Sequence, residues 1–195
     1  MLEQFRLKTI KDADFYYVPN FFDEFVSASY FEWLRKNVEW EQKTVKFSTV
    51  TNQLPRMTSW FGDKPYFYSG IMNPPKPMPP IIDGIKAAIE NFAGSGYTFN
   101  SVLLNLYRHN NDSVSAHRDN EKGMGENPNV ASISLGADRL FRLKNMEASV
   151  TIDLLLENGS LLLMGNQSQI KYYHSIPKLK TFYGERINLT FRRMI

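Results

Sequence analysis

The segment that decides the fold has the sequence RINLTFR and spans residues 186–192. Polar and apolar side chains alternate strictly along it, which is the period of a β-strand. Arg186 and Arg192 therefore share one face, and two arginines on one side of a core strand are costly unless something anionic lies between them. A small dicarboxylate meets that need, because each guanidinium can hold a carboxylate through two hydrogen bonds. The alternative is an edge strand whose polar face lies in water.

Similar short segments, rich in branched and aromatic residues, follow Tyr97 and alternate with polar turns. The candidate strands span residues 101–108, 130–135, 139–144, 149–154, 160–164, 172–176 and 186–192. Many closely spaced strands with no helix between them indicate an antiparallel sandwich or barrel, and a jelly roll is the natural candidate.

Two helices are expected before this β-rich part. A short strand over residues 14–22 leads into a helix that Asp23 caps and that runs to Asn37. Five prolines predict a loop over residues 70–80, and a second helix follows over 81–92. The apolar spacing predicts core-facing positions on both helices: Phe25, Ala28, Phe31, Leu34 and, at the edge, Arg35; then Ile82, Ile85, Ala88 and Ile89. The fold class is therefore α+β.

The bulk composition is that of a globular protein with one core. A chain of 195 residues is long enough for a single well-buried domain over residues 1–195, with an N-terminal part (14–96) and a β-rich core (97–193). The net charge of +3 and the pI of about 9.0 permit a polyanionic partner without requiring one. The absence of cysteine excludes disulfides, thiolate metal sites, iron–sulfur clusters and cysteine nucleophiles.

The chain has three histidines, and two of them suggest a metal site: His109, His117 and His174. His117 and Asp119 lie two residues apart, so on an extended segment both side chains point to the same face. His174, from a distant strand, can complete two histidines and one carboxylate, the facial triad of non-haem iron(II) oxygenases. A His-x-Asp pair alone is common without a metal. We expect no function for His109, which lies in a polar turn.

Asn105 and Tyr107 form a second pair, two residues apart on the strand predicted over 101–108. Their side chains face the same way. They can supply an amide and a phenol to one ligand, or they belong to a polar face turned to solvent.

Together these motifs resemble the AlkB family of iron(II)- and 2-oxoglutarate-dependent dioxygenases. The resemblance rests on the order and spacing of NLY (105–107), HRD (117–119), His174 and the Arg-x5-Arg pattern of 186–192. It extends to three flanking stretches: ASISLGA (131–137), NGSLLLM (158–164) and HSIP (174–177). Upstream, Pro55-Arg56, Gly62-Asp63 and YFYSG (66–70) are similar to the nucleotide-recognition segment of DNA-repair members. The resemblance covers roughly residues 14–193.

The resemblance implies a double-stranded β-helix, a jelly-roll variety that agrees with the strand pattern. Its catalytic iron ligands would be three side chains: His117, Asp119 and His174. Its 2-oxoglutarate pocket would be formed by six: Asn105, Tyr107, Arg186, Asn188, Thr190 and Arg192. Of these, Arg186 would hold the distal carboxylate, and Arg192 would lie near the metal-chelating end.

The resemblance also implies a substrate base, which such chemistry reaches only when the base is flipped or single-stranded. Tyr66 and Tyr68 match aromatic positions that line the base pocket in DNA-repair members. Other expected base-edge or phosphate contacts are these: Arg56, Lys64, Ser69, Arg118, Asn120 and Glu121. Repair relatives carry an aspartate at the position of Asn120, so its contact is expected to differ. Phe47 or Val50 would form an intercalating wedge, although hairpin packing explains both equally well.

The implied function is oxidative dealkylation of N-alkylated bases in DNA, such as 1-methyladenine and 3-methylcytosine, as repair of alkylation damage. Iron(II) would be the cofactor and 2-oxoglutarate and oxygen the co-substrates. Decarboxylation of 2-oxoglutarate would give succinate, and the alkyl group would be released as an aldehyde. The alternatives are an RNA demethylase, a protein or small-molecule hydroxylase of the same fold, and a catalytically silent binding module. We expect no leader and no membrane span, because the N-terminal residues carry charges throughout and no apolar run approaches the length of a membrane span. We therefore expect a soluble, intracellular monomer, cytoplasmic in a prokaryote or nuclear in a eukaryote.

Overall fold

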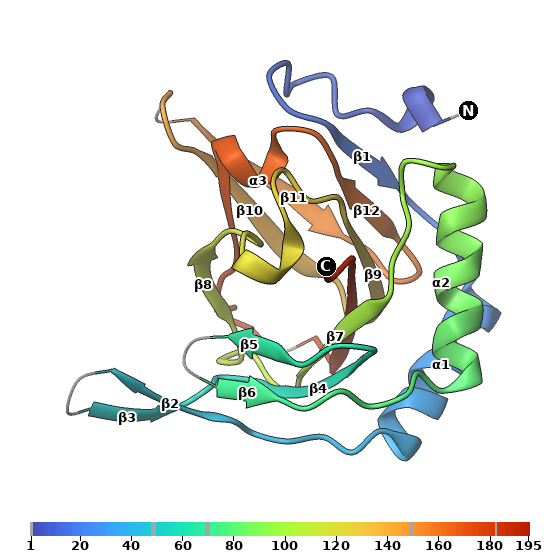
Figure 1. Cartoon of the computed structure of the whole chain (residues 1–195), viewed down its shortest axis with the longest axis vertical. Coiled ribbons are helices and arrows are strands. Elements are labelled where there is room, and N and C mark those ends of the chain that lie inside the picture. Colours follow the sequence, from blue (N-terminus) through green and yellow to red (C-terminus); the bar gives the residue numbers. More distant parts are fainter. Residues whose placement is uncertain (1, 48–49, 69–70, 149, 182) are drawn as a thin grey trace.

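Two antiparallel β-sheets pack face to face, and helices cover the outer face of the larger sheet (Figure 1). The computed structural model describes residues 2–47, 50–68, 71–148, 150–181 and 183–195. The larger sheet has the strand order β1-β12-β9-β14-β7-β4, and the smaller sheet has the order β11-β10-β13-β8. This arrangement confirms the jelly-roll core expected from the sequence.

The two sheets combine predicted strands with strands that the sequence does not predict, and the strand predicted over 14–22 is shorter than expected. The larger sheet contains β1 (Phe15–Val18), β4 (Met57–Gly62), β7 (Ser101–Tyr107), β9 (Val130–Gly136), β12 (Leu161–Met164) and β14 (Arg186–Arg192). The smaller sheet contains β8 (Val114–His117), β10 (Arg139–Asn145), β11 (Thr151–Leu156) and β13 (Tyr172–Ile176). All seven strands predicted after Tyr97 are present, with ends shifted by at most two residues.

Strand β14 occupies the middle of the larger sheet. It pairs with β7 on one side and with β9 on the other, so that Arg186 lies opposite both Tyr107 and Gly136. All seven of its residues are buried. The edge-strand alternative is therefore wrong, and the polar face of this strand lies inside the protein.

The helices cover the apolar face of that same sheet. They are α1 (Glu24–Asn37) and α2 (Pro80–Ala93); shorter turns are η1 (Leu2–Phe5), η2 (Lys122–Met124) and α3 (Ser168–Lys171). Asp23 caps α1 as predicted, because its side chain accepts the backbone N–H of Val26 at 2.9 Å. Ile82, Ile85 and Ile89 of α2 are fully buried in a core cluster with side chains of β7, β9 and β14, which confirms the predicted face, although Ala88 is only half-buried.

The predicted core face of α1 is wrong at its beginning. Phe25 is 81% exposed and Ala28 is also exposed, whereas Ser27 and Leu34 are buried. The cause is a close approach to the turn at Gly159, where an added Cβ would lie only 2.5 Å from the Ser27 hydroxyl oxygen. Only a small residue fits there, and the Ser27 hydroxyl is satisfied by the Phe22 carbonyl oxygen at 3.1 Å.

Several strands before residue 97 were not predicted. Strand β4 joins the larger sheet, so this sheet takes strands from both predicted parts of the chain. Two small hairpins pair β2 (Thr44–Phe47) with β3 (Val50–Gln53), and β5 (Tyr66–Tyr68) with β6 (Ile71–Asn73). The loop prediction for 70–80 is therefore wrong for 71–73, because the prolines begin only after Asn73. Strand β4 is not predicted because polar Thr58 and Ser59 are buried beside aromatic residues, so polar and apolar side chains do not alternate along it.

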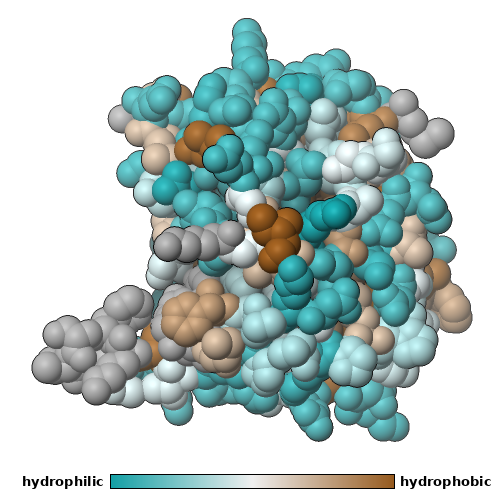
Figure 2. Space-filling model, in the orientation of Figure 1, coloured by the Kyte–Doolittle hydropathy of each residue, from teal (hydrophilic) through white to brown (hydrophobic). Residues whose placement is uncertain are grey.

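The surface carries scattered rather than continuous apolar side chains. Figure 2 shows a mainly hydrophilic face on which hydrophobic residues form small, separate areas. Within the described part of the chain, no helix is long and apolar enough to cross a membrane.

Truncating a side chain on the buried face of α1 should destabilise the protein much more than truncating one on its exposed face. Leu34→Ala removes a fully buried side chain and should lower the free energy of unfolding by about 2–5 kcal/mol. Phe25→Ala on the same helix removes an exposed ring and should change it by less than about 0.5 kcal/mol. Urea unfolding followed by circular dichroism measures both. Equal destabilisation by the two substitutions would contradict the observed orientation of α1.

Candidate active site

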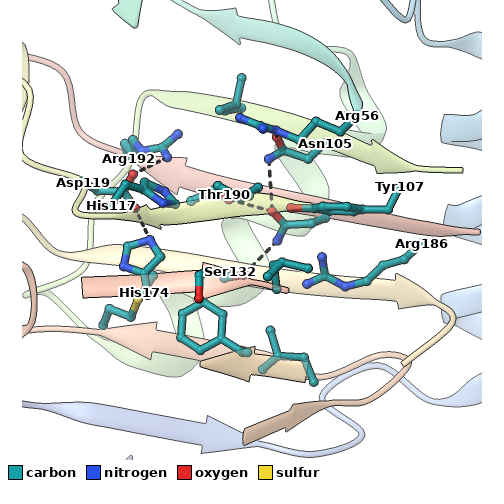
Figure 3. Close-up of a pocket in the computed structure, with 18 of the residues that line it drawn as sticks. Arg56, Asn105, Tyr107, His117, Asp119, Ser132, His174, Arg186, Thr190 and Arg192 are labelled. Atoms are coloured by element: carbon teal, nitrogen blue, oxygen red, sulfur yellow. Dashed lines mark hydrogen bonds and ion pairs between the residues drawn. The ribbon is translucent and has the colours of Figure 1, made fainter. Parts of the chain in front are cut away.

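A pocket lies between the two sheets, and the polar face of β14 forms one of its walls (Figure 3). Its empty volume, which includes open solvent at the mouth, is about 530 Å³. Side chains from β7, β9 and β14 line it on the larger sheet, and side chains from β10 and β13 line it on the smaller one.

The predicted metal ligands meet at one end of this pocket. His117 ends β8, Asp119 follows two residues later, and His174 lies opposite His117 on β13. Their ligand atoms all lie within 4.8 Å of one another. His174 Nε2 is 3.7 Å from Asp119 Oδ2, and this buried oxygen has no hydrogen-bond partner among the described residues. The arrangement is the one expected of three ligands that share one ion.

Arg192 fixes the carboxylate of Asp119 from the larger sheet. Its Nη2 donates to Asp119 Oδ1 at 2.6 Å, and both side chains are buried. Burial alone would raise the pKa of Asp119, but Arg192 and the two histidines outweigh it and hold the pKa at about 2. Burial, reinforced by His117, lowers the pKa of His174 to about 3. The cluster therefore has a charged carboxylate and a neutral His174, the forms that bind metal ions.

The donor set fits iron(II). Two imidazoles and one carboxylate form the triad typical of non-haem iron(II) oxygenases, which leaves positions for other ligands. The unpartnered Oδ2 of Asp119 supports this interpretation, because a buried carboxylate oxygen is normally satisfied by a donor or a metal.

Arg186 lines the pocket away from the metal ligands. It is 1% exposed, and its Nη2 donates to the Ser134 hydroxyl at 2.9 Å. Among the described residues, its Nε and Nη1 have no hydrogen-bond partner. Its guanidinium carbon lies 5.2 Å from the centre of the Tyr107 ring. Burial lowers the pKa of Arg186 to about 10, so it stays charged at neutral pH and needs an anion.

Asn188 links the polar side chains between the two arginines. Its Oδ1 accepts from Asn105 Nδ2 at 3.2 Å and from the Thr190 hydroxyl at 2.9 Å. Its Nδ2 donates to the Ser132 hydroxyl at 2.8 Å. Asn105 and Tyr107 are buried in the pocket wall, so the solvent-facing alternative is wrong for both.

Tyr66 and Arg56 lie in the wall of the pocket rather than on the surface. Tyr66 is 1% exposed, its ring stacks on Trp60 with centroids 4.4 Å apart, and its hydroxyl donates to Glu121 Oε1 at 2.8 Å. Arg56 is 4% exposed and donates to Asn105 Oδ1 at 2.8 Å. In this arrangement Tyr66 does not present an open ring face to a base, and Arg56 does not reach an exposed phosphate.

The other expected substrate contacts differ in their exposure and in whether the structure describes their side chains. Arg118 lies against Tyr173, with its guanidinium carbon 5.3 Å from the ring centre. Asn120 and Lys64 are exposed. Ser69 lies outside the described residues, as do the side chains of three others: Phe47, Val50 and Tyr68.

Sequence reasoning missed several residues of the site. Ser132 and Ser134 lie at alternating positions of β9, so the sequence of that strand contained a pattern that could have indicated a polar face. Arg139 is buried, and its guanidinium carbon lies 5.2 Å from the centre of the Tyr107 ring. A single arginine in a strand gives no pattern from which this position could be predicted. Gln169 lies on a single helical turn, and its side-chain oxygen accepts a hydrogen bond from the backbone N–H of Asp119 at 2.9 Å. A turn this short has no periodic pattern from which the sequence could predict the contact.

Comparison with known proteins agrees with this geometry. The model of the 2OG-Fe(II) oxygenase superfamily matches residues 14–192. The alpha-ketoglutarate-dependent dioxygenase alkB homolog 3 of Bos taurus is 38% identical over 184 residues, which cover 89% of this chain and 64% of that protein. The DNA oxidative demethylase ALKBH2 of Homo sapiens is 34% identical over 154 residues, which cover 74% and 58%. A solved structure of OsALKBH1 shares the fold, with a TM-score of 0.67 at 17% identity over 94% of this chain and 98% of that one.

The chain belongs to the 2OG-Fe(II) oxygenase superfamily, whose cofactors are iron(II), 2-oxoglutarate and oxygen. Within it, the similar proteins are AlkB homologues, which confirms the resemblance seen in the sequence. The chain spans about 64% of the length of the alkB homolog 3 relatives that it matches.

Burial of His174 in its neutral form predicts that acid destabilises the metal-free protein. The pKa of this residue is about 3 in the fold and 6.5 in the unfolded chain, so the unfolded chain binds the extra proton between these values. The free energy of unfolding should therefore fall by up to ~1.4 kcal/mol for each pH unit below about 6.5. Asp119, with a lowered pKa, adds a loss only below about pH 4.

Urea unfolding of metal-free protein between pH 7 and pH 5 measures this slope. His174→Gln, which cannot take up the proton, should show a smaller slope than the unsubstituted protein. The same slope in both proteins would show that His174 is not buried in its neutral form.

Proposed function

We propose that this chain removes alkyl groups oxidatively from N-alkylated bases in DNA. The reaction is coupled to the oxidative decarboxylation of 2-oxoglutarate by oxygen, which gives succinate and carbon dioxide, and it releases the alkyl group as an aldehyde. The observation that carries the proposal is the shared pocket of the His117–Asp119–His174 cluster and the buried Arg186. A metal site and a buried cation with open donors in one cavity suit a metal-chelating dicarboxylate.

In this proposal His117, Asp119 and His174 hold iron(II). When bound, iron(II) and 2-oxoglutarate together supply the oxidising power drawn from oxygen. Arg192 keeps the Asp119 carboxylate ionised and oriented through its hydrogen bond at 2.6 Å. Asp119 and His174 are buried, which limits the access of bulk water to this side of the cluster.

The pocket residues would orient the co-substrate. Arg186 has two nitrogen atoms without partners among the described residues, and these can hold a distal carboxylate. Tyr107 packs against the Arg186 guanidinium, and Asn105 and Thr190 are fixed through Asn188. The wall is therefore preorganised before the ligand binds, which reduces the entropic cost of binding.

The nucleic-acid part of the proposal is supported by the relatives and by the site. One of the similar proteins is named a DNA oxidative demethylase, and the net charge of +3 suits a polyanion. Because the cluster lies inside a pocket between two sheets, a base must leave the duplex stack to reach it. Repair of alkylated DNA is the proposed role, and 1-methyladenine and 3-methylcytosine are the proposed lesions.

Incubation of the protein with iron(II), 2-oxoglutarate, oxygen and a 1-methyladenine oligonucleotide tests this function. Mass spectrometry should show loss of the methyl group, and His117→Ala should abolish it. Single-stranded DNA, duplex DNA and RNA of the same sequence are compared in parallel. Turnover of 2-oxoglutarate with every oligonucleotide unchanged would replace the nucleobase with a protein or small molecule. No turnover of either in iron-loaded protein would favour a silent binding module.

Arg186→Met tests the proposed role of the buried cation. Loss of a buried, hydrogen-bonded charge partner costs about 2–5 kcal/mol of binding free energy, so the KM for 2-oxoglutarate should rise at least ~30-fold. Succinate formation as a function of 2-oxoglutarate concentration measures this. Arg142→Met, on the exposed face of β10, is the matched control and should leave the KM unchanged. An unchanged KM in Arg186→Met would place the distal carboxylate elsewhere.

A further inference from the structure

Gln169 is a buried side chain, outside the expected ligand set, that contacts a metal-ligand residue directly. It lies on the single turn of α3 and is 1% exposed. Its Oε1 accepts the backbone N–H of Asp119 at 2.9 Å. Its Nε2 faces Met164 Sδ at 3.6 Å and the Ser168 hydroxyl at 3.4 Å. The amide is therefore oriented with its oxygen toward the Asp119 backbone.

The segment that carries Asp119 needs such a contact. Strand β8 is the edge strand of the smaller sheet, and its register with β13 shifts between the pairs made by His174 and Ile176. Asp119 lies two residues beyond the end of this strand. Its backbone N–H is bound by a side chain rather than by a neighbouring strand.

Helix α3 connects this segment to the second histidine ligand. It passes directly into β13, so Gln169 and His174 are five residues apart on one continuous piece of backbone. Arg118 adds a weaker contact to the same turn, from its Nη1 to the Ile170 carbonyl oxygen at 3.5 Å. Gln169 thus joins the segment that carries His117 and Asp119 to the one that carries His174.

We propose that Gln169 is a positioning residue that fixes the Asp119 backbone relative to His174, so that the metal-binding geometry exists before an ion binds. Arg192 holds the carboxylate of Asp119, and Gln169 holds its backbone. Neither contact alone determines both the position and the direction of the side chain. The inference rests on the proposed metal role of His117, Asp119 and His174.

Manganese(II) titration of the metal-free protein by calorimetry tests the proposal, because manganese(II) replaces iron(II) without oxidation. Gln169→Met keeps an unbranched chain but loses the amide, and it should weaken manganese(II) binding by about 10–100-fold, as loss of an outer contact to a ligand typically does. Gln169→Glu keeps an acceptor oxygen and should retain much more of the affinity. Ile170→Ala, on the exposed side of the same turn, should bind as the unsubstituted protein does.

Amide hydrogen exchange at Asp119 in the metal-free protein is the second readout. Exchange should be faster in Gln169→Met than in the unsubstituted protein, and close to normal in Gln169→Glu. Gln169→Leu replaces Gln169→Met if the latter does not fold. Unchanged manganese(II) affinity and unchanged exchange in a folded Met or Leu variant would overturn the proposal. So would an equal loss of affinity in Gln169→Glu.

The same experiment separates this inference from the proposed function. His117→Ala should lose manganese(II) binding if the proposed ligand set is correct. If the unsubstituted protein binds no manganese(II), the proposed function fails. Exchange at Asp119 then still decides whether Gln169 holds this backbone.

Discussion

The buried ion pair between Arg192 and Asp119 is the constraint on which the rest of the site depends. It joins the central strand of the larger sheet to the segment after the edge strand of the smaller one. Burial of charge costs several kcal/mol for each ion unless pairing compensates it. Arg192 is compensated by Asp119, whereas Arg186 has no carboxylate in the pocket lining. The pocket therefore carries positive charge that the protein does not balance, which is the physical basis for binding a dianion.

The same strand, β14, also separates the polar interior between the sheets from the apolar layer under the helices. β14 places its polar side chains between the sheets and its apolar ones against the helices. The interior of this sandwich is partly polar, and the hydrophobic cluster between the sheets is supplemented by further apolar burial elsewhere. Leu34 of α1 and the isoleucines of α2 provide it on the outer face. The helices thus allow the space between the sheets to serve as a ligand pocket.

The sequence predicts the elements whose side chains alternate or repeat, such as β14 and α2. The His-x-Asp spacing also predicts that His117 and Asp119 face the same way, and the resemblance implies that His174 joins them. In the structure His174 does so because its strand pairs with the strand that ends at His117. The sequence does not predict contacts set by close approach of distant segments. Phe25 turns outward because Gly159 meets the helix at Ser27, and Tyr66 is covered by Trp60. Gln169 was missed for the same reason, since its role depends on the packing of one short turn.

The central position of β14 also bears on how the protein is made. This strand is the last of the larger sheet to leave the ribosome, yet β7 and β9 both depend on it for pairing. Until it arrives, the two strands have open inner edges, which is the state that invites pairing with other chains. Asp119 likewise lacks its arginine until residue 192 has been synthesised. A nascent chain therefore cannot assemble the complete oxidising centre, and the reactive chemistry is withheld until the sheet around it has closed.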